Sequence, residues 1–280
     1  MKQWKETFMR LVFLLCACVS ILAVVLICVF LFAGGLPAMQ EIGLKEFLLG
    51  LRWKPASDLY GIFPMIVGSL YGAILIGVPT GVLCAVFLAR FCPKKLYRTL
   101  KPVTELLAGI PSIVYGFFGL VVIVPLIQRL VGGGGKSVLT ASLLLGIMIL
   151  PTIIGVSESA IRAVPESYYE GALALGATHE RSVFCAMLPA ARSGITAGVI
   201  LGVGRAIGEA MAVSMVAGNQ PVIPESLLAG VRTLTANVVM EMGYAQDLHR
   251  EALIATAVVL FVFILLINIS FSLLKRRDRT

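Results

Sequence analysis

Six long runs of mostly apolar residues divide this chain, with polar and charged residues gathered between them. A bilayer-spanning helix needs about 20 consecutive, predominantly apolar residues. The runs that we expect to span a membrane are Leu11–Phe32, Ile62–Ala89, Val103–Ile127, Val138–Ser157, Gly194–Gly218 and Ala252–Leu274. The first run exceeds the core of a cleaved signal peptide, which is about 7–15 residues, so we expect it to remain as a span. The pattern predicts an all-α integral membrane protein with six transmembrane helices.

The composition agrees with this prediction. Hydrophobic residues make up 59% of the chain and charged residues 14%, whereas about a quarter of a soluble domain is charged. The formal net charge is +8, but the basic residues lie at the ends of the apolar runs and form no basic arm. We therefore expect the chain to sit in a lipid bilayer and to bind no nucleic acid.

The distribution of basic residues predicts the orientation. With the amino terminus inside, fifteen Lys and Arg residues fall on the cytoplasmic side and seven outside. This bias follows the positive-inside rule, so both termini are expected in the cytoplasm. We divide the chain into residues 1–61, an amino-terminal transmembrane helix with an external loop, and a core transmembrane domain of residues 62–280. The longest cytoplasmic loop of this core covers about residues 158–193.

Neither metal nor cofactor chemistry is expected. Of the six cysteines, four lie within apolar runs, and Cys92 and Cys185 fall in segments assigned to the cytoplasm. No Cys-x-x-Cys pair occurs, so we expect no disulfide and no zinc site. The segment Gly132–Ser137 has the letters GGGGKS, but a phosphate-binding P-loop needs glycine where Leu130 stands. The chain is therefore not expected to be an enzyme or to hydrolyse ATP itself.

Prolines within the runs indicate broken or kinked helices, which lipid tolerates where neighbouring helices or a water-filled cavity satisfy the backbone. They occur at Pro79, Pro111, Pro125 and Pro151. Two charges, Arg205 and Glu209, lie in the fifth run. Their i, i+4 spacing predicts that both side chains lie on one face of a helix. Ionisable residues within a membrane span mark either a substrate pathway or an ion pair that joins helices. A guanidinium matches the geometry of oxyanions.

The loop between the fourth and fifth runs predicts two short helices. Pro165 begins the first, which covers Tyr168–Leu175, and Gly176 supplies the turn. The second runs from Thr178 to Met187 and ends before Pro189. Spacing alone fits a docking surface for a soluble partner and a merely compact loop equally well.

This loop resembles the EAA motif of ABC-importer permeases. Glu170, Ala172, Gly176, Leu188 and Pro189 match the motif, while Gly171 replaces its central Ala and Ala186 stands where Ile is usual. The resemblance implies the type I ABC importer permease fold. It also implies that Glu170, Gly171, Ala172, Gly176, Leu188 and Pro189 couple the chain to an ATPase subunit.

Three further segments resemble phosphate importer permeases, and the PstC type more than its PstA partner. They are IPSIVYGFFGL (residues 110–120), GRAIGEAMAVSMVAGN (residues 204–219) and LTAN (residues 234–237). This resemblance implies a bacterial inner-membrane permease that moves inorganic phosphate inward, with Arg205 and Glu209 on the substrate pathway. The implied partners are a second, PstA-like permease in a heterodimer, two copies of an ABC ATPase, and an external phosphate-binding protein.

Other functions remain open at this point. The chain can be a PstA-type subunit or a permease for another oxyanion such as molybdate or sulfate. It can also be a membrane partner in phosphate sensing and signalling. An ion-coupled carrier is disfavoured because internal repeats of discontinuous helices are not evident.

Overall fold

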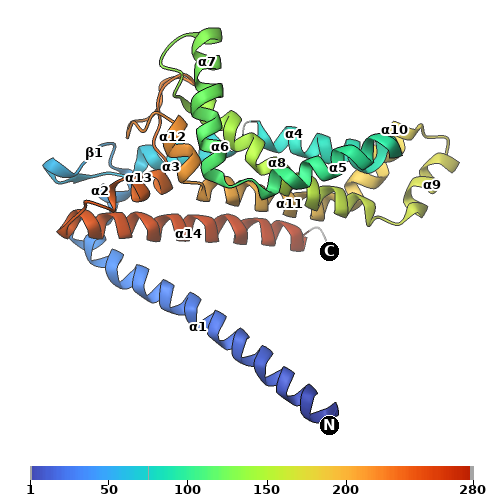
Figure 1. Ribbon diagram of the computed structural model, residues 1–280, viewed down its shortest axis with the longest axis horizontal. Helices are drawn as coiled ribbons and strands as arrows, with labels where there is room; N and C mark the ends of the chain where they lie inside the picture. The colour runs from blue at the N-terminus through green and yellow to red at the C-terminus, as the bar shows by residue number, and fades with distance from the viewer. Residues whose placement is uncertain (1, 75, 278–280) are drawn as a thin grey trace.

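The computed structural model describes residues 2–74 and 76–277 of the 280-residue chain, and shows an elongated helical bundle (Figure 1). At one end of the long axis lie α2 (Leu44–Leu49), α13 (Leu234–Glu241) and a hairpin of β1 (Trp53–Lys54) and β2 (Leu59–Tyr60), joined by the 3₁₀ turn η1 (Pro55–Ser57). At the other end lie α9 (Glu166–Ala174) and α10 (His179–Ser182). The remaining helices are α1 (Lys2–Ile42), α3 (Phe63–Ile74), α4 (Gly77–Val86), α5 (Lys94–Gly109), α6 (Ser112–Phe118), α7 (Val124–Val131), α8 (Val138–Arg162), α11 (Leu188–Gly208), α12 (Met211–Val216) and α14 (Asp247–Arg277), with π-helical turns η2 (Phe87–Phe91), η3 (Gly119–Ile123) and η4 (Val183–Met187).

Among the described residues, five helices are long and apolar enough to cross a membrane: Glu6–Ile42, Ser112–Val131, Val138–Arg162, His179–Gly208 and Asp247–Ser270. The first, fourth and sixth predicted runs are thus confirmed as single helices, each longer than its apolar run. The other three runs are not single helices as predicted. Of the basic residues used to predict the orientation, Arg279 lies outside the described residues.

The second run is broken between α3 and α4, near Leu75, which itself lies outside the described residues. Pro79 lies in the first turn of α4, where its missing N–H is not needed for a helical hydrogen bond. Gly77 begins that helix, and a Cβ atom there would come within 2.7 Å of Ile149. The break and the glycine together let α4 approach α8 closely.

The third run is broken at Pro111. Ile110 has an extended backbone (φ −72°, ψ 126°), as expected for a residue before proline, and it ends α5. The predicted span from Val103 to Ile127 therefore covers part of α5 and part of the helix that starts at Ser112. Pro151, in contrast, lies inside α8 without interrupting it.

Helix α8 is the centre of the bundle, and glycines bring its neighbours close. A Cβ atom at Gly81 of α4 would lie 2.9 Å from Ile153, and one at Gly202 of α11 would lie 2.5 Å from the same side chain. Ile153 is fully buried. Small residues of this kind let membrane helices pack backbone to backbone. By this packing, α4, α8 and α11 form one close-packed unit.

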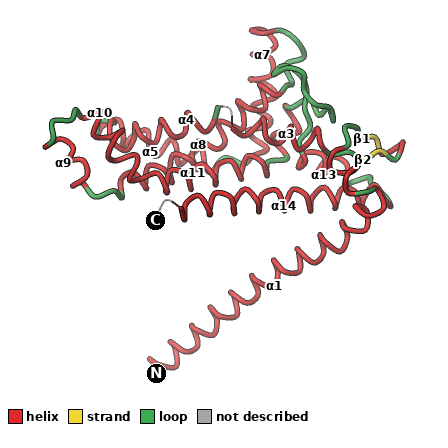
Figure 2. Tube along the Cα trace, turned by 180° about the vertical axis from the view of Figure 1, so that it is seen from behind, coloured by secondary structure: helices red, strands yellow, loops and turns green. Residues whose placement is uncertain are grey.

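Helix α1 leaves the body of the molecule at an angle (Figure 2). Its carboxyl-terminal part packs on α14, where a Cβ atom at Gly35 would lie 2.9 Å from Ala255. The most apolar 18-residue window of α1 has no residue buried inside this chain. The bundle itself therefore covers only the end of α1 that adjoins the hairpin.

Candidate functional site

The loop predicted to dock a partner is an ordered helix–turn–helix. Helix α9 ends in a Schellman motif, in which Ala177 N–H donates to the Ala172 carbonyl at 3.1 Å and Gly176 N–H to the Leu173 carbonyl at 2.8 Å. Gly176 has φ +83°, a left-handed conformation that glycine adopts without strain. Thr178 then caps α10 by accepting a hydrogen bond from Arg181 N–H. The predicted turn at Gly176 is confirmed.

Side chains fix this loop to the end of η2. The Arg90 guanidinium donates two hydrogen bonds to the Glu166 carboxylate at 3.1 and 3.0 Å, and it lies over the Tyr169 ring. The Tyr169 hydroxyl is 2.7 Å from Nδ1 of His179, whose ring meets Phe91 edge-on. Hydrogen bonding from Arg90 lowers the pKa of the Glu166 carboxyl, so this pair is charged at neutral pH. The loop is held as a unit of defined shape.

Four of the six predicted docking residues, Glu170, Gly171, Ala172 and Gly176, lie on α9 and the turn after it. Glu170, Gly171 and Gly176 are exposed, and Leu175 is 91% exposed at the tip. A hollow of about 390 Å³ lies between the two helices, lined in part by Ala172, Gly176 and Ala186. An exposed apolar tip beside a hollow is typical of a surface that binds another protein.

The sequence predicted that the second helix of the loop ends before Pro189, and this prediction was wrong. The π-helical turn η4 leads directly into α11, and Leu188 and Pro189 are the first residues of α11. Proline fits there because the first turn needs no N–H donor and because a π-turn rearranges the preceding hydrogen bonds. Any displacement of α10 therefore passes into α11 without an intervening loop.

Arg205 lies in the last turn of α11 and is exposed on the surface of this chain. Its Nη1 donates to the Thr152 hydroxyl of α8 at 3.4 Å, a long hydrogen bond. Because Thr152 follows Pro151 near the middle of α8, the guanidinium sits near the mid-depth of the bundle. The flanking Gly204 and Gly208 have no atom within 4 Å of a Cβ position. No other described part of the chain packs on α11 at Gly204 and Gly208, and we call this the open face of α11. The Arg205 guanidinium places a positive charge on it.

Glu209 does not share a helix face with Arg205, and this prediction was wrong. Helix α11 ends at Gly208, and Glu209 has an extended backbone (φ −74°, ψ 122°). Its carboxylate instead accepts a hydrogen bond from Ala212 N–H at 3.0 Å, in the first turn of α12. No ion pair joins the two side chains, both of which the structure describes. The helix break turns the carboxylate to the amino end of α12, where the helix dipole favours an anion.

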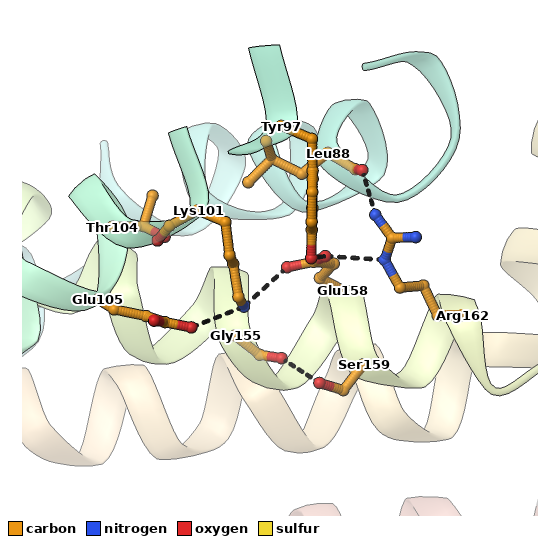
Figure 3. Close-up of polar contacts among 9 residues, drawn as sticks. All are labelled: Leu88, Tyr97, Lys101, Thr104, Glu105, Gly155, Glu158, Ser159 and Arg162. Carbon is orange, nitrogen blue, oxygen red and sulfur yellow. Dashed lines mark hydrogen bonds and ion pairs between the residues drawn. The ribbon is translucent and has the colours of Figure 1, made fainter. Parts of the chain in front are cut away.

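A buried carboxylate that the sequence did not single out lies at the far end of α8 (Figure 3). Glu158 is 2% exposed and accepts hydrogen bonds from the Tyr97 hydroxyl at 2.8 Å, Lys101 Nζ at 3.0 Å and Arg162 Nε at 2.8 Å. Nη2 of Arg162 donates to the Leu88 carbonyl at 2.7 Å. The signal in the sequence was the i, i+4 spacing of Glu158 with Arg162 and of Tyr97 with Lys101. That spacing gave no indication that the two pairs meet.

A second unpredicted cluster holds the hairpin end. Glu241 of α13 is 7% exposed and pairs with Arg232, with the Trp53 Nε1–H at 2.8 Å and with Nε2 of His249 at 2.9 Å. The rings of Trp53 and Tyr60 pack edge-on across the hairpin. These contacts fix residues 53–60 to the core helices α13 and α14.

Comparison with known proteins gives the family. Residues 77–280 match the family model described as the binding-protein-dependent transport system inner membrane component. The chain is 40% identical to a probable ABC transporter permease protein, YqgH, of Bacillus subtilis (strain 168), covering 95% of this chain and 91% of that one. It is 36% identical to the phosphate transport system permease protein PstC of Mesorhizobium japonicum, covering 89% and 84%. It is 32% identical to a probable phosphate transport system permease protein PstC of Methanocaldococcus jannaschii, covering 88% of this chain and 85% of that one. The resemblance to PstC-type permeases is thus confirmed.

Solved structures give the same fold. An inward-facing MetNI methionine ABC transporter matches with a TM-score of 0.58 at 22% identity, covering 81% of this chain and 99% of that one. An amino acid ABC transporter matches with a TM-score of 0.53 at 19% identity, covering 77% and 93%. Both have the type I importer permease fold, as the resemblance had implied. The chain therefore belongs to the family of binding-protein-dependent transport system inner membrane components and is a membrane-embedded permease subunit of an ABC transporter.

Proposed function

We propose that this chain is a PstC-type permease that moves inorganic phosphate into the cytoplasm. The observation that carries the proposal is the Arg205 guanidinium, a cation on the open face of α11 near mid-depth of the bundle. Its planar set of donors fits a tetrahedral oxyanion, and only one of them has a protein partner among the described residues. The PstC names of several relatives favour phosphate among the oxyanions.

The complex that we propose has four kinds of component. The open face of α11 needs a second permease, PstA-like, to close a pathway around Arg205. The exposed tip at Leu175 and the hollow beside Gly176 dock a separate ABC ATPase, present in two copies, which hydrolyses the ATP. An external phosphate-binding protein delivers the substrate at the hairpin end. Glu209 lies on this pathway four residues after Arg205, where its carboxylate caps the amino end of α12.

The substrate is tested by uptake. Cells that lack this gene should lose high-affinity uptake of labelled phosphate, and the gene on a plasmid should restore it. Uptake of sulfate and molybdate serves as the control and should not change. If sulfate or molybdate uptake falls instead, the permease serves another oxyanion. If no oxyanion uptake changes, while the response of the cells to phosphate starvation does, the chain acts in sensing.

The orientation is tested by labelling. The loop α9–α10 and the carboxyl end of α14 lie toward one end of the bundle, with the hairpin at the other (Figures 1 and 2), which supports cytoplasmic placement of the loop and of that terminus. In a chain whose six free cysteines are replaced, a membrane-impermeant thiol reagent should label a cysteine placed at Ser57 or Ser226 in intact cells. It should label a cysteine at Ser167 only after the membrane is opened. All three sites are exposed on the protein, so the side of the membrane alone decides which of them is labelled. Labelling of position 167 in intact cells would overturn the topology.

A further inference from the structure

A continuous series of contacts runs from the docking loop to the backbone break beside Arg205. It begins with the bidentate pair of Arg90 and Glu166, which joins α9 to η2. It continues in the ion-pair cluster of α8, because Arg162 of that cluster hydrogen-bonds the carbonyl of Leu88, which lies two residues before Arg90 in the same turn. The docking loop, η2 and the end of α8 are thus connected by charged hydrogen bonds, which are the stronger kind.

The next step, from α8 to α5, depends on Glu158. No residue of α5 is fully buried, and its half-buried apolar side chains are few, so apolar packing holds this helix only weakly. What joins it to α8 is the cluster in Figure 3, in which Tyr97 and Lys101 of α5 donate to the buried Glu158 carboxylate. A carboxylate taken out of water costs several kcal/mol unless it is well paired. Glu158 therefore favours the one position of α5 that supplies both donors.

The last steps lead from α5 to the pathway. The Tyr115 hydroxyl of α6 donates to the Leu107 carbonyl of α5 at 2.8 Å, which bridges the break at Pro111. On the same helix, a Cβ atom at Gly116 would lie 2.9 Å from Ala212 of α12, so α6 and α12 touch backbone to backbone. The N–H of Ala212 is the group that Glu209 caps. The series ends four residues from Arg205.

We propose that Glu158, through Lys101 and Tyr97, is a positioning residue that makes the docking loop, α5 and α6 move as one body. Movement imposed on α9 then reaches the backbone beside Arg205 through α5, in addition to the direct path through α11. This inference rests on the proposed function for the identity of the cargo, but the mechanical link holds for any substrate. A solely stabilising cluster would need no connection to both ends of this series.

The test uses Lys101→Met in the assembled complex with its ATPase, in lipid nanodiscs. Methionine keeps the length of the side chain and removes the charge, while Glu158 keeps Tyr97 and Arg162, so we expect normal assembly. Lys101→Arg keeps the cation and should behave as the wild type. Lys95→Met is the matched control, because Lys95 is exposed on the same helix and lies outside the cluster.

Two readouts are compared. Nitroxide labels at Ser167 of α9 and Phe117 of α6, both exposed, report the distance between loop and pathway by double electron–electron resonance. When a non-hydrolysable ATP analogue is added, the distance between the two labels should not change in the wild type, Lys101→Arg or Lys95→Met. In Lys101→Met the analogue should shift this distance or broaden its distribution. Phosphate transported per ATP hydrolysed should fall at least about threefold in Lys101→Met alone.

The two proposals fail in different ways. If Lys101→Met keeps the wild-type distance and the wild-type transport per ATP, the positioning role is wrong. If the Lys95→Met control shows the same losses as Lys101→Met, the effect is one of charge on α5, and the positioning role is again wrong. If the wild-type complex moves no phosphate while the distance still responds only in Lys101→Met, the proposed cargo is wrong and the mechanical link stands.

Discussion

Arg205→Gln should abolish phosphate uptake while the complex still assembles in the membrane. Among the described residues, the guanidinium makes one long hydrogen bond, to Thr152, so its removal leaves little unsatisfied inside the protein. What it removes is the cation on the open face of α11, and a charged hydrogen bond to substrate contributes about 1.5–3 kcal/mol. We therefore expect Arg205→Lys to reduce uptake at least about tenfold, because lysine keeps the charge but lacks the planar pair of donors. Initial rates of phosphate uptake, normalised to assembled complex, measure both effects.

Arg129→Gln is the matched control, since Arg129 is an exposed arginine at the end of α7 and lies away from the open face. The competing hypothesis is that Arg205 and Glu209 only hold helices together. It predicts that the double variant Arg205→Gln with Glu209→Gln transports nearly normally, as neutralising a buried pair is often tolerated. The absence of an ion pair between these two described side chains speaks for the other result. Near-normal uptake by the double variant would remove Arg205 from the pathway.

Gly176→Trp should release the ATPase from the permease at equal expression. At φ +83° a non-glycine residue costs about 1–2 kcal/mol, and tryptophan also fills the open space next to Ala172 and Leu175. Both effects fall on the outer face of the docking loop, so we expect at least about tenfold less ATPase to co-purify, equivalent to about 1.4 kcal/mol of binding. Gly176→Asn should retain the ATPase, because asparagine tolerates the left-handed conformation and is small.

The control for this prediction lies on the other side of the molecule. Gly132, at the end of α7, has φ +84° and likewise no neighbour within 4 Å of a Cβ position. Gly132→Trp therefore also carries backbone strain at a positive φ, without touching the loop, and should leave the ATPase bound. If both tryptophan variants lose the ATPase equally, the loss reflects instability and the docking assignment to Gly176 is wrong. An ATPase that stays bound to Gly176→Trp would contradict it directly.

Properties that depend on local sequence were predictable. Five of the six apolar runs overlap helices that are long and apolar enough to cross a membrane, because burial in lipid needs only length and hydrophobicity. The turn at Gly176 followed from the backbone preference of glycine, and the structure has it. The motif in the loop identified the family for the same reason, because its residues lie within one short segment.

Prolines indicated where helices could break, but the tertiary structure alone decided which spans break and which charges meet. Apolar residues satisfy lipid equally well in a continuous helix and in two halves, so hydrophobicity could not place the breaks between α3 and α4, at Pro111 and after Gly208. The break after Gly208 is what turned Glu209 away from Arg205 and onto α12. Glu158 meets Lys101 across 57 residues, and Glu241 meets Trp53 across 188. Such pairs form because the packing of α8 and α13 against distant segments removes these carboxylates from water, and a local pattern carries no information about which donor will then be within reach.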